Sequence, residues 1–156
     1  MHVIAAKAVA FKEALGPEFR AYQLQVVKNA RELADALMSR GIEIFSGGTD
    51  THLMLINLAN KSITGKEAEE ALDRAGITVN KNSIPYDKQP AAITSGIRVG
   101  TPIVTSRKMR EPEMVSIADL ISSILDNPTN STTIQHVRDK VRALCKKFPV
   151  YSEIEV

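Results

Sequence analysis

Residues 53–58 read Leu-Met-Leu-Ile-Asn-Leu, and this short run decides the class of fold. Its side chains are apolar on both alternating faces, which is typical of a strand in the centre of a sheet. Three more stretches, residues 42–45, 77–79 and 93–99, are rich in β-branched residues and predict further strands. Residues 80–90 are polar and contain two prolines, which predicts an ordered loop.

Helical periodicity surrounds these strands. Five stretches predict helices, because their apolar residues recur at every third or fourth position or, in the first stretch, cover several faces. They span residues 2–15, 17–40, 64–75, 114–125 and 134–148. The third has the spacing of a capping box at Thr64 and Glu67, and the first is apolar enough to predict a well-buried helix. The order of elements predicts an α/β (α+β) fold, with a short, partly antiparallel sheet covered by helices.

The composition is that of one soluble globular domain. The chain has 156 residues, of which 44% are hydrophobic and 24% charged, so wholesale disorder is excluded. No run of 18 apolar residues occurs, and no membrane partner is expected. A single cysteine, together with the absence of a leader pattern, favours a reducing, cytoplasmic setting. The net charge of +2 and the 4% aromatic content argue against nucleic-acid binding.

The sharpest chemical signal is Arg98, which lies in the run Thr-Ser-Gly-Ile-Arg-Val-Gly at residues 94–100. The two-residue period of a strand puts Ile97 and Val99 on one face and Arg98 on the other. Flanking glycines allow a ligand or another backbone to approach closely. A guanidinium matches a carboxylate with two parallel hydrogen bonds. Two interpretations therefore stand: a carboxylate-binding arginine, or a structural ion pair with an aspartate or glutamate.

Four other features carry weaker signals. The turn at Gly47-Gly48 is either a phosphate cradle, without the lysine of a P-loop, or a plain turn. Residues 80–83 gather hydrogen-bonding groups that serve either ligand recognition or turn chemistry. Cys145 lies on the apolar stripe of the last predicted helix and is interpreted as a core thiol. The basic residues at 107–110 are interpreted as a solvated loop. One cysteine and three separated histidines predict no metal site.

The motifs taken in order resemble the C-terminal portion of serine hydroxymethyltransferase. The runs that carry the resemblance are HVIAAKAVA at 2–10, SGGTDTHL at 46–53, TGKEA at 64–68, ITVNKNSIP at 77–85, TSGIRVGTP at 94–102 and KFPVY at 147–151. The resemblance implies a pyridoxal-phosphate enzyme of the aspartate-aminotransferase fold. Such an enzyme moves a one-carbon unit from serine to tetrahydrofolate and yields glycine and methylenetetrahydrofolate. It also implies a homodimer, with residues 1–16 forming a helix at the junction with a large domain and residues 17–156 forming the small C-terminal domain.

Residue by residue, the resemblance implies that Arg98 binds the substrate carboxylate. It implies that Asn82 belongs to the wall of the folate site. Pro90, Ala91 and Ala92 occupy the place of a segment, often Ser-Pro-Phe, that touches folate in the family, but the aromatic residue is absent here.

The cofactor lysine of the family lies in a threonine-rich stretch that ends in His-Lys, and this chain has no matching run. Lys7, Lys66 and Lys81 do not match that lysine. We therefore expect a truncated chain that by itself binds no pyridoxal phosphate and has no catalytic residue of its own, whereas the intact enzyme uses the cofactor. Two alternatives remain. One is a non-catalytic interaction module left by a split or degraded gene, and the other is a free-standing domain that binds a small anion through Arg98.

Overall fold

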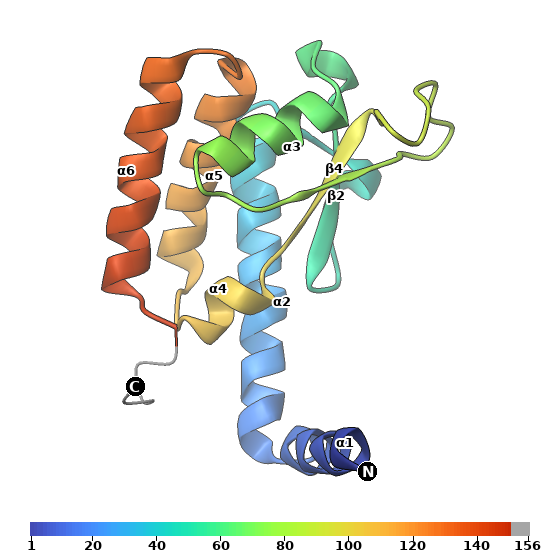
Figure 1. Ribbon diagram of the computed structural model, residues 1–156, viewed down its shortest axis with the longest axis vertical. Coiled ribbons are helices and arrows are strands. Elements are labelled where there is room, and N and C mark those ends of the chain that lie inside the picture. The colour runs from blue at the N-terminus through green and yellow to red at the C-terminus, as the bar shows by residue number, and fades with distance from the viewer. Residues whose placement is uncertain (151–156) are drawn as a thin grey trace.

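The computed structural model describes residues 1–150 (Figure 1). Its elements follow the expected order, apart from one additional short helix, α4. They are α1 (His2–Ala14), α2 (Pro17–Met38), β1 (Glu43–Ile44), η1 (Phe45–Gly47), β2 (Leu53–Asn57), η2 (Ala59–Lys61), α3 (Gly65–Arg74), β3 (Asn80–Asn82), β4 (Gly96–Gly100), α4 (Pro102–Ser106), α5 (Glu111–Asp126) and α6 (Ser131–Lys147), where η marks a 3-10 turn. Tyr151 of the KFPVY run and the rest of the expected domain to residue 156 lie outside the described residues.

The four strands of residues 1–150 form one sheet in the order β1-β2-β4-β3, and every pairing is antiparallel. As its apolar faces predict, β2 is central, with β1 on one side and β4 on the other. Helices α2, α3, α5 and α6 group to one side of the sheet (Figure 1). The core lies between them and joins Leu33 and Leu37 of α2 to Ile56, Ile97 and Ile121. The predicted class, a small α/β domain with helices over a short sheet, is confirmed.

The third strand begins later than the sequence predicts. Residues 77–79 form no strand, and β3 instead occupies the start of the predicted loop, with Asn80 opposite Arg98 and Asn82 opposite Gly96. The apolar side chain of Val79 is buried in the core instead. Because β3 is an edge strand, its backbone pairs on one side only and its side chains need not be apolar. The strand at residues 77–79 was predicted from its apolar side chains, whereas the bounds of β3 are set by its backbone pairing with β4.

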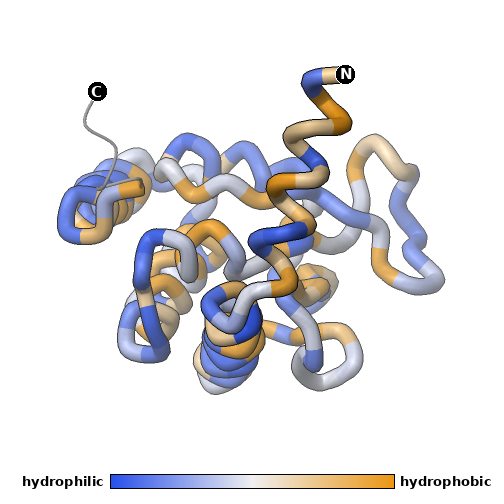
Figure 2. The backbone as a smooth tube through the Cα atoms, turned by 90° about the horizontal axis from the view of Figure 1, so that it is seen from below, coloured by the Kyte–Doolittle hydropathy of each residue, from blue (hydrophilic) through white to orange (hydrophobic). Residues whose placement is uncertain are grey.

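Helix α1 is not the well-buried helix that its apolar composition predicts. All of its residues are exposed, and Val3, Ile4, Val9 and Phe11 keep 52%, 63%, 58% and 69% of their surface in solvent. The chain turns at Gly16, and α1 projects from the body at the foot of α2 (Figure 1). Apolar residues recur along the whole projecting helix (Figure 2). The helix packs against α2, and because none of its residues is buried, its apolar surface lies uncovered in residues 1–150.

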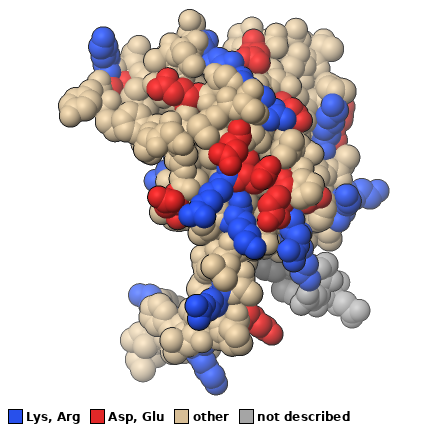
Figure 3. All heavy atoms as spheres, turned by 180° about the vertical axis from the view of Figure 1, so that it is seen from behind, with Lys and Arg blue, Asp and Glu red and all other residues tan. Residues whose placement is uncertain are grey.

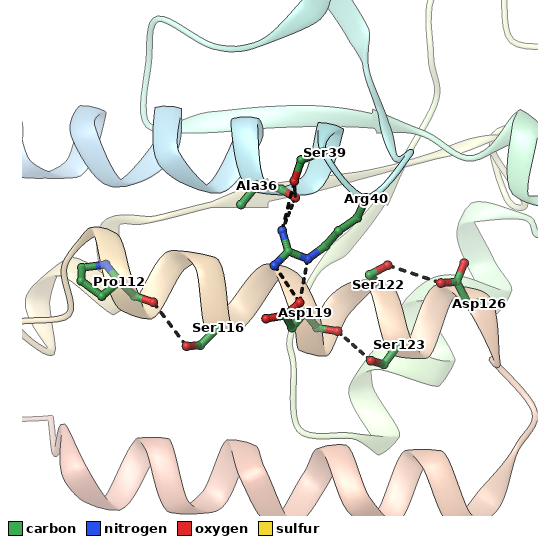
Figure 4. A network of polar contacts seen from close by, with 9 residues as sticks. All are labelled: Ala36, Ser39, Arg40, Pro112, Ser116, Asp119, Ser122, Ser123 and Asp126. Atoms are coloured by element: carbon green, nitrogen blue, oxygen red, sulfur yellow. Dashed lines mark hydrogen bonds and ion pairs between the residues drawn. The ribbon is translucent and has the colours of Figure 1, made fainter.

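Polar contacts fix the ends of two helices. Helix α3 begins with the predicted capping box, since the Thr64 hydroxyl accepts from the Glu67 N–H and the Glu67 carboxylate accepts from the Thr64 N–H. Just after α2, Arg40 donates to the carbonyl of Ala36 and to the carboxylate of Asp119 on α5 (Figure 4). The Arg40 Nη2 to Asp119 Oδ1 distance is 2.7 Å. This contact joins the carboxyl end of α2 to the middle of α5.

The basic segment at residues 107–110 is a loop, as expected, and Lys108 and Arg110 are exposed, but Arg107 is not a solvated side chain. Arg107 directly follows α4 and is half-buried, and its Nη1 donates to the carbonyls of Cys145 at 3.4 Å and Phe148 at 2.7 Å. The last carbonyls of a helix have no partner within the helix, so the guanidinium satisfies two acceptors at the end of α6. Cys145 itself is half-buried and not part of the core.

Candidate functional site

Arg98 lies at the centre of β4, on the face of the sheet that is turned away from the core. Ile97 and Val99 are buried, whereas Arg98 is exposed, as strand alternation predicts. Among residues 1–150, no hydrogen bond or ion pair engages its guanidinium. The alternative of a structural ion pair therefore finds no support in the described residues. Arg98 is thus an exposed arginine whose guanidinium donors have no acceptor within residues 1–150.

On the face of β4 that carries Arg98, the next residue on either side is a glycine and has no side chain. Gly96 and Gly100 lie two positions away on either side and so face the same way. A Cβ on Gly96 would lie 2.7 Å from the carbonyl oxygen of Ile56 and 3.0 Å from that of Asn82, so a glycine here lets β2, β4 and β3 pack closely. A Cβ on Gly100 would lie 3.2 Å from the carbonyl oxygen of His52. The guanidinium is therefore flanked by bare backbone.

Strand β3 brings two amides onto the same face. Asn80 pairs directly with Arg98, and Asn82 pairs with Gly96. Directly opposite residues of an antiparallel pair share a face, so both asparagines lie on the side of Arg98. Asn82 is half-buried, and its Nδ2 donates to the carbonyl of Ser83 at 2.8 Å. The sequence analysis left Asn80, as one of residues 80–83, between ligand recognition and turn chemistry and gave it no separate role in the site. Its alternation with Asn82 would have indicated one only if the strand had been placed at residues 80–82.

Pro90, Ala91 and Ala92 are exposed in the loop between β3 and β4. They form a turn in which the carbonyl of Pro90 accepts from the N–H groups of Ile93 at 2.8 Å and Thr94 at 3.0 Å. The turn lies beyond the Gly96 end of β4 and no described contact joins it to Arg98. The structure thus groups Arg98 with Asn80 and Asn82 on the sheet and places 90–92 in the adjoining loop.

A carboxylate in this loop was missed by the sequence analysis. Asp87 accepts hydrogen bonds from the N–H groups of Ile84, Gln89 and Ser95 and from the Ser95 hydroxyl. The Ser95 hydroxyl, followed by the Gln89 N–H, lowers the pKa of Asp87 to about 2, so the side chain is a carboxylate at neutral pH. An aspartate just after a proline-containing turn is the one signal that pointed to it.

The described residues do not form a complete pyridoxal-phosphate site. Such a site needs a lysine amine, a partner for the ring nitrogen and donors for the phosphate, all converging on one cavity. Lys7 is exposed on α1, Lys66 is exposed beside Glu70, and the Nζ of Lys81 lies 3.2 Å from the carboxylate of Glu69. None of these amines converges with Arg98 on the open face of the sheet. Residues 1–150 therefore do not fit the whole cofactor.

Charged side chains, metal-ligating groups and helix hydropathy describe the remaining surface of residues 1–150. On the face seen from behind, acidic and basic side chains are interspersed, and the projecting part also carries charged side chains, most of them basic (Figure 3). Within residues 1–150, no three metal-ligating side chains of the His, Cys, Asp and Glu types gather at one place. No helix in the same residues is long and apolar enough to cross a membrane.

The described residues thus form an α/β domain with an exposed arginine, without a partner in residues 1–150, on the open face of its sheet. The family model of serine hydroxymethyltransferase matches residues 1–121, out of 156 in the chain. The matched part includes the whole sheet, Arg98 and the loop at 83–95. This chain belongs to the serine hydroxymethyltransferase family. The family uses pyridoxal phosphate, and its substrates are serine, glycine and folate.

Proposed function

We propose that this chain is the small C-terminal domain of a serine hydroxymethyltransferase, with residues 1–16 at the junction to a large domain and residues 17–156 as the small domain. In the intact enzyme, Arg98 binds the carboxylate of serine and glycine. Asn82 and the segment Pro90–Ala92 form part of the wall that receives tetrahydrofolate. The observation that carries this proposal is the unpaired guanidinium of Arg98 between two glycines on the open face of the sheet.

The chemistry of Arg98 suits this role. Its planar fork pairs with a carboxylate through two hydrogen bonds and so fixes the direction of the bound amino acid as well as its position. Orientation matters because the reacting bond must stay aligned with the catalytic groups. Strand β4 is paired on both sides, by β2 and by β3, so the backbone beneath Arg98 is held rigidly. An arginine on a paired strand positions a ligand better than one on a loop.

The cofactor chemistry belongs to the intact enzyme. Pyridoxal phosphate supplies the electron sink for the carbon chemistry there. Because the chain lacks the threonine-rich run that ends in His-Lys, we expect that it does not turn over serine by itself. The exposed apolar helix α1 suits a surface that the large domain or the second subunit of a homodimer covers. Cys145 is a free thiol among the described residues, which suits a reducing compartment such as the cytoplasm.

The first test replaces Arg98 with alanine in the complete enzyme. The loss of a two-point carboxylate contact should raise the KM for serine and also lower kcat, each on the order of tenfold or more. Arg98→Lys keeps the positive charge but not the planar guanidinium, so its KM and kcat should lie between those of the unmodified enzyme and those of Arg98→Ala. Arg138→Ala removes an exposed arginine from α6 and serves as the control. Kinetics of Arg98→Ala that match those of the control contradict the assignment.

The second test measures turnover of serine labelled at its side-chain carbon, with pyridoxal phosphate and tetrahydrofolate present. The purified chain alone should form no labelled methylenetetrahydrofolate, and addition of the remaining part of the enzyme should restore the product. Product from the chain alone, once contamination is excluded, contradicts the proposal. Absence of product in both arms favours the second candidate, a non-catalytic interaction module. The uncovered apolar surface of α1 is the observation that favours such a module.

A further inference from the structure

The loop between β3 and β4 is organised around one carboxylate. It spans residues 83–95 and is closed by the pairing of Asn82 with Gly96. Asp87 Oδ2 accepts from the N–H of Ile84 at 3.1 Å and from the N–H of Ser95 at 2.8 Å. Asp87 Oδ1 accepts from the N–H of Gln89 at 2.9 Å and from the hydroxyl of Ser95 at 2.6 Å. The side chain therefore joins both legs of the loop and its tip.

All four donors to Asp87 are neutral groups. No lysine or arginine of residues 1–150 forms an ion pair with Asp87, so the carboxylate charge is balanced by hydrogen bonds alone. Hydrogen bonds that involve a charged partner are shorter and stronger than neutral ones. Each donor has a direction, and the two oxygens together fix the relative placement of Ile84, Gln89 and Ser95.

The returning leg of the loop is held from a second direction by α3. The carbonyls of Ile93 and Thr94 accept from the N–H groups of Lys66 and Gly65, at 3.0 Å and 2.9 Å. These two N–H groups belong to the first turn of α3, where a helix has no internal acceptors. Residues 90–92 thus lie between two anchored points: Gln89, which Asp87 holds, and Ile93, which α3 holds. Without Asp87, only the α3 anchor remains.

We propose that Asp87 is a positioning residue that couples the folate-facing segment 90–92 to the strand that carries Arg98. Asp87 touches neither ligand and acts through Gln89 and Ser95, three residues before Arg98 in the chain. This inference rests on the proposed function, because it takes residues 90–92 as part of the folate site. It adds a residue that sets the distance between the amino-acid carboxylate and the folate.

The test compares Asp87→Asn with the unmodified complete enzyme. The amide replaces one oxygen by a donor, so two of the four accepted hydrogen bonds are lost. The KM for tetrahydrofolate should rise roughly tenfold, because only part of the lost hydrogen-bond energy reaches folate through the loop. The KM for serine should change by less than about twofold, as for an ordinary surface substitution. Asp87→Glu keeps the carboxylate and should recover part of the folate KM. Asp73→Asn makes the same charge change at an exposed position of α3 and is the control.

A milder variant distinguishes the proposed effect from a folding defect in Asp87→Asn. Ser95→Ala removes only the hydroxyl donor and should raise the folate KM in the same direction by a smaller factor. Amide hydrogen exchange should become faster at Ile84, Gln89 and Ser95 in Asp87→Asn. The inference is overturned if the folate KM stays unchanged in both variants, or if the serine and folate KM values rise equally. The proposed function fails separately, through an Arg98→Ala variant with an unchanged KM for serine.

Discussion

Replacement of Gly96 by alanine tests the close packing that underlies the site. Gly96 is buried at the start of β4, and its φ is not in the left-handed region, so the backbone itself accepts alanine. The added Cβ would lie 2.7 Å from the carbonyl oxygen of Ile56, 2.7 Å from Cγ2 of Ile84 and 3.0 Å from the carbonyl oxygen of Asn82. The first and last of these atoms belong to the backbones of the two neighbouring strands, which do not yield independently of the sheet.

The expected change in the free energy of unfolding of Gly96→Ala is the sum of two opposing contributions. Overpacking of a well-packed region costs about 1–3 kcal/mol. A Gly→Ala change in an allowed conformation returns about 0.4–1 kcal/mol, because the unfolded chain loses freedom. The net expectation is a loss of about 1–2 kcal/mol in the free energy of unfolding, or roughly 2–8 °C in Tm for a chain of this size. Gly100→Ala is the matched control, since its Cβ meets nothing nearer than 3.2 Å, at the carbonyl oxygen of His52.

The assay is urea and thermal unfolding of the isolated chain, followed by far-UV circular dichroism because the sequence contains no tryptophan. Gly96→Ala should unfold at lower urea than Gly100→Ala with an unchanged slope, and Gly100→Ala should lose less stability because its one close contact, to the His52 carbonyl oxygen, is longer. If Gly96→Ala is as stable as Gly100→Ala, the three strands are not packed as closely as the geometry requires, and the reasoning fails.

Two further predictions concern pH and a buried amide. The pKa of Asp87 is lowered to about 2, below the unfolded value near 3.9, so its contribution to stability is present above pH 4 and is lost as the pH falls from about 4 to about 2. Urea titrations should show the stability difference between the parent and Asp87→Asn shrinking over that range. Asn29 is fully buried, and its Nδ2 donates to the Thr105 hydroxyl at 2.8 Å and to the Met109 carbonyl at 3.0 Å. Asn29→Ala should cost about 2–3 kcal/mol in the same assay, against almost nothing for the exposed Gln23→Ala.

The long helices and the central strand could be predicted because each repeats one strong local signal. Helix α2 carries apolar residues at steps of three and four over 22 residues, and such length leaves little ambiguity. The capping box at Thr64 and Glu67 depends only on residues three positions apart. In β2, Met54 and Ile56 are fully packed and the alternate residues are half-buried. The class of fold follows from these elements.

The elements that were missed are those decided by distant partners. Strand β3 exists because Asn80 and Asn82 find β4 more than ten residues later, and neither side chain predicts a strand. Arg107 is drawn out of solvent by two carbonyls at the end of α6, about forty residues away in the chain. Helix α1 was predicted as a helix, but its burial was not predicted correctly, for the opposite reason. Its apolar pattern predicts a covering surface that residues 1–150 do not supply.

The position of Arg98 could be read from strand alternation, but its freedom from partners could not. Only the set of contacts in the fold shows that Arg40, Lys61 and Lys81 find carboxylates, while Arg98 does not. Glycine weakens a strand by roughly 0.5–1 kcal/mol, so two glycines beside one arginine cost stability. The close approach of the neighbouring strands accounts for Gly96. Gly100 has more room around it than Gly96, and its missing side chain leaves the face beside Arg98 open, as the proposed carboxylate site requires.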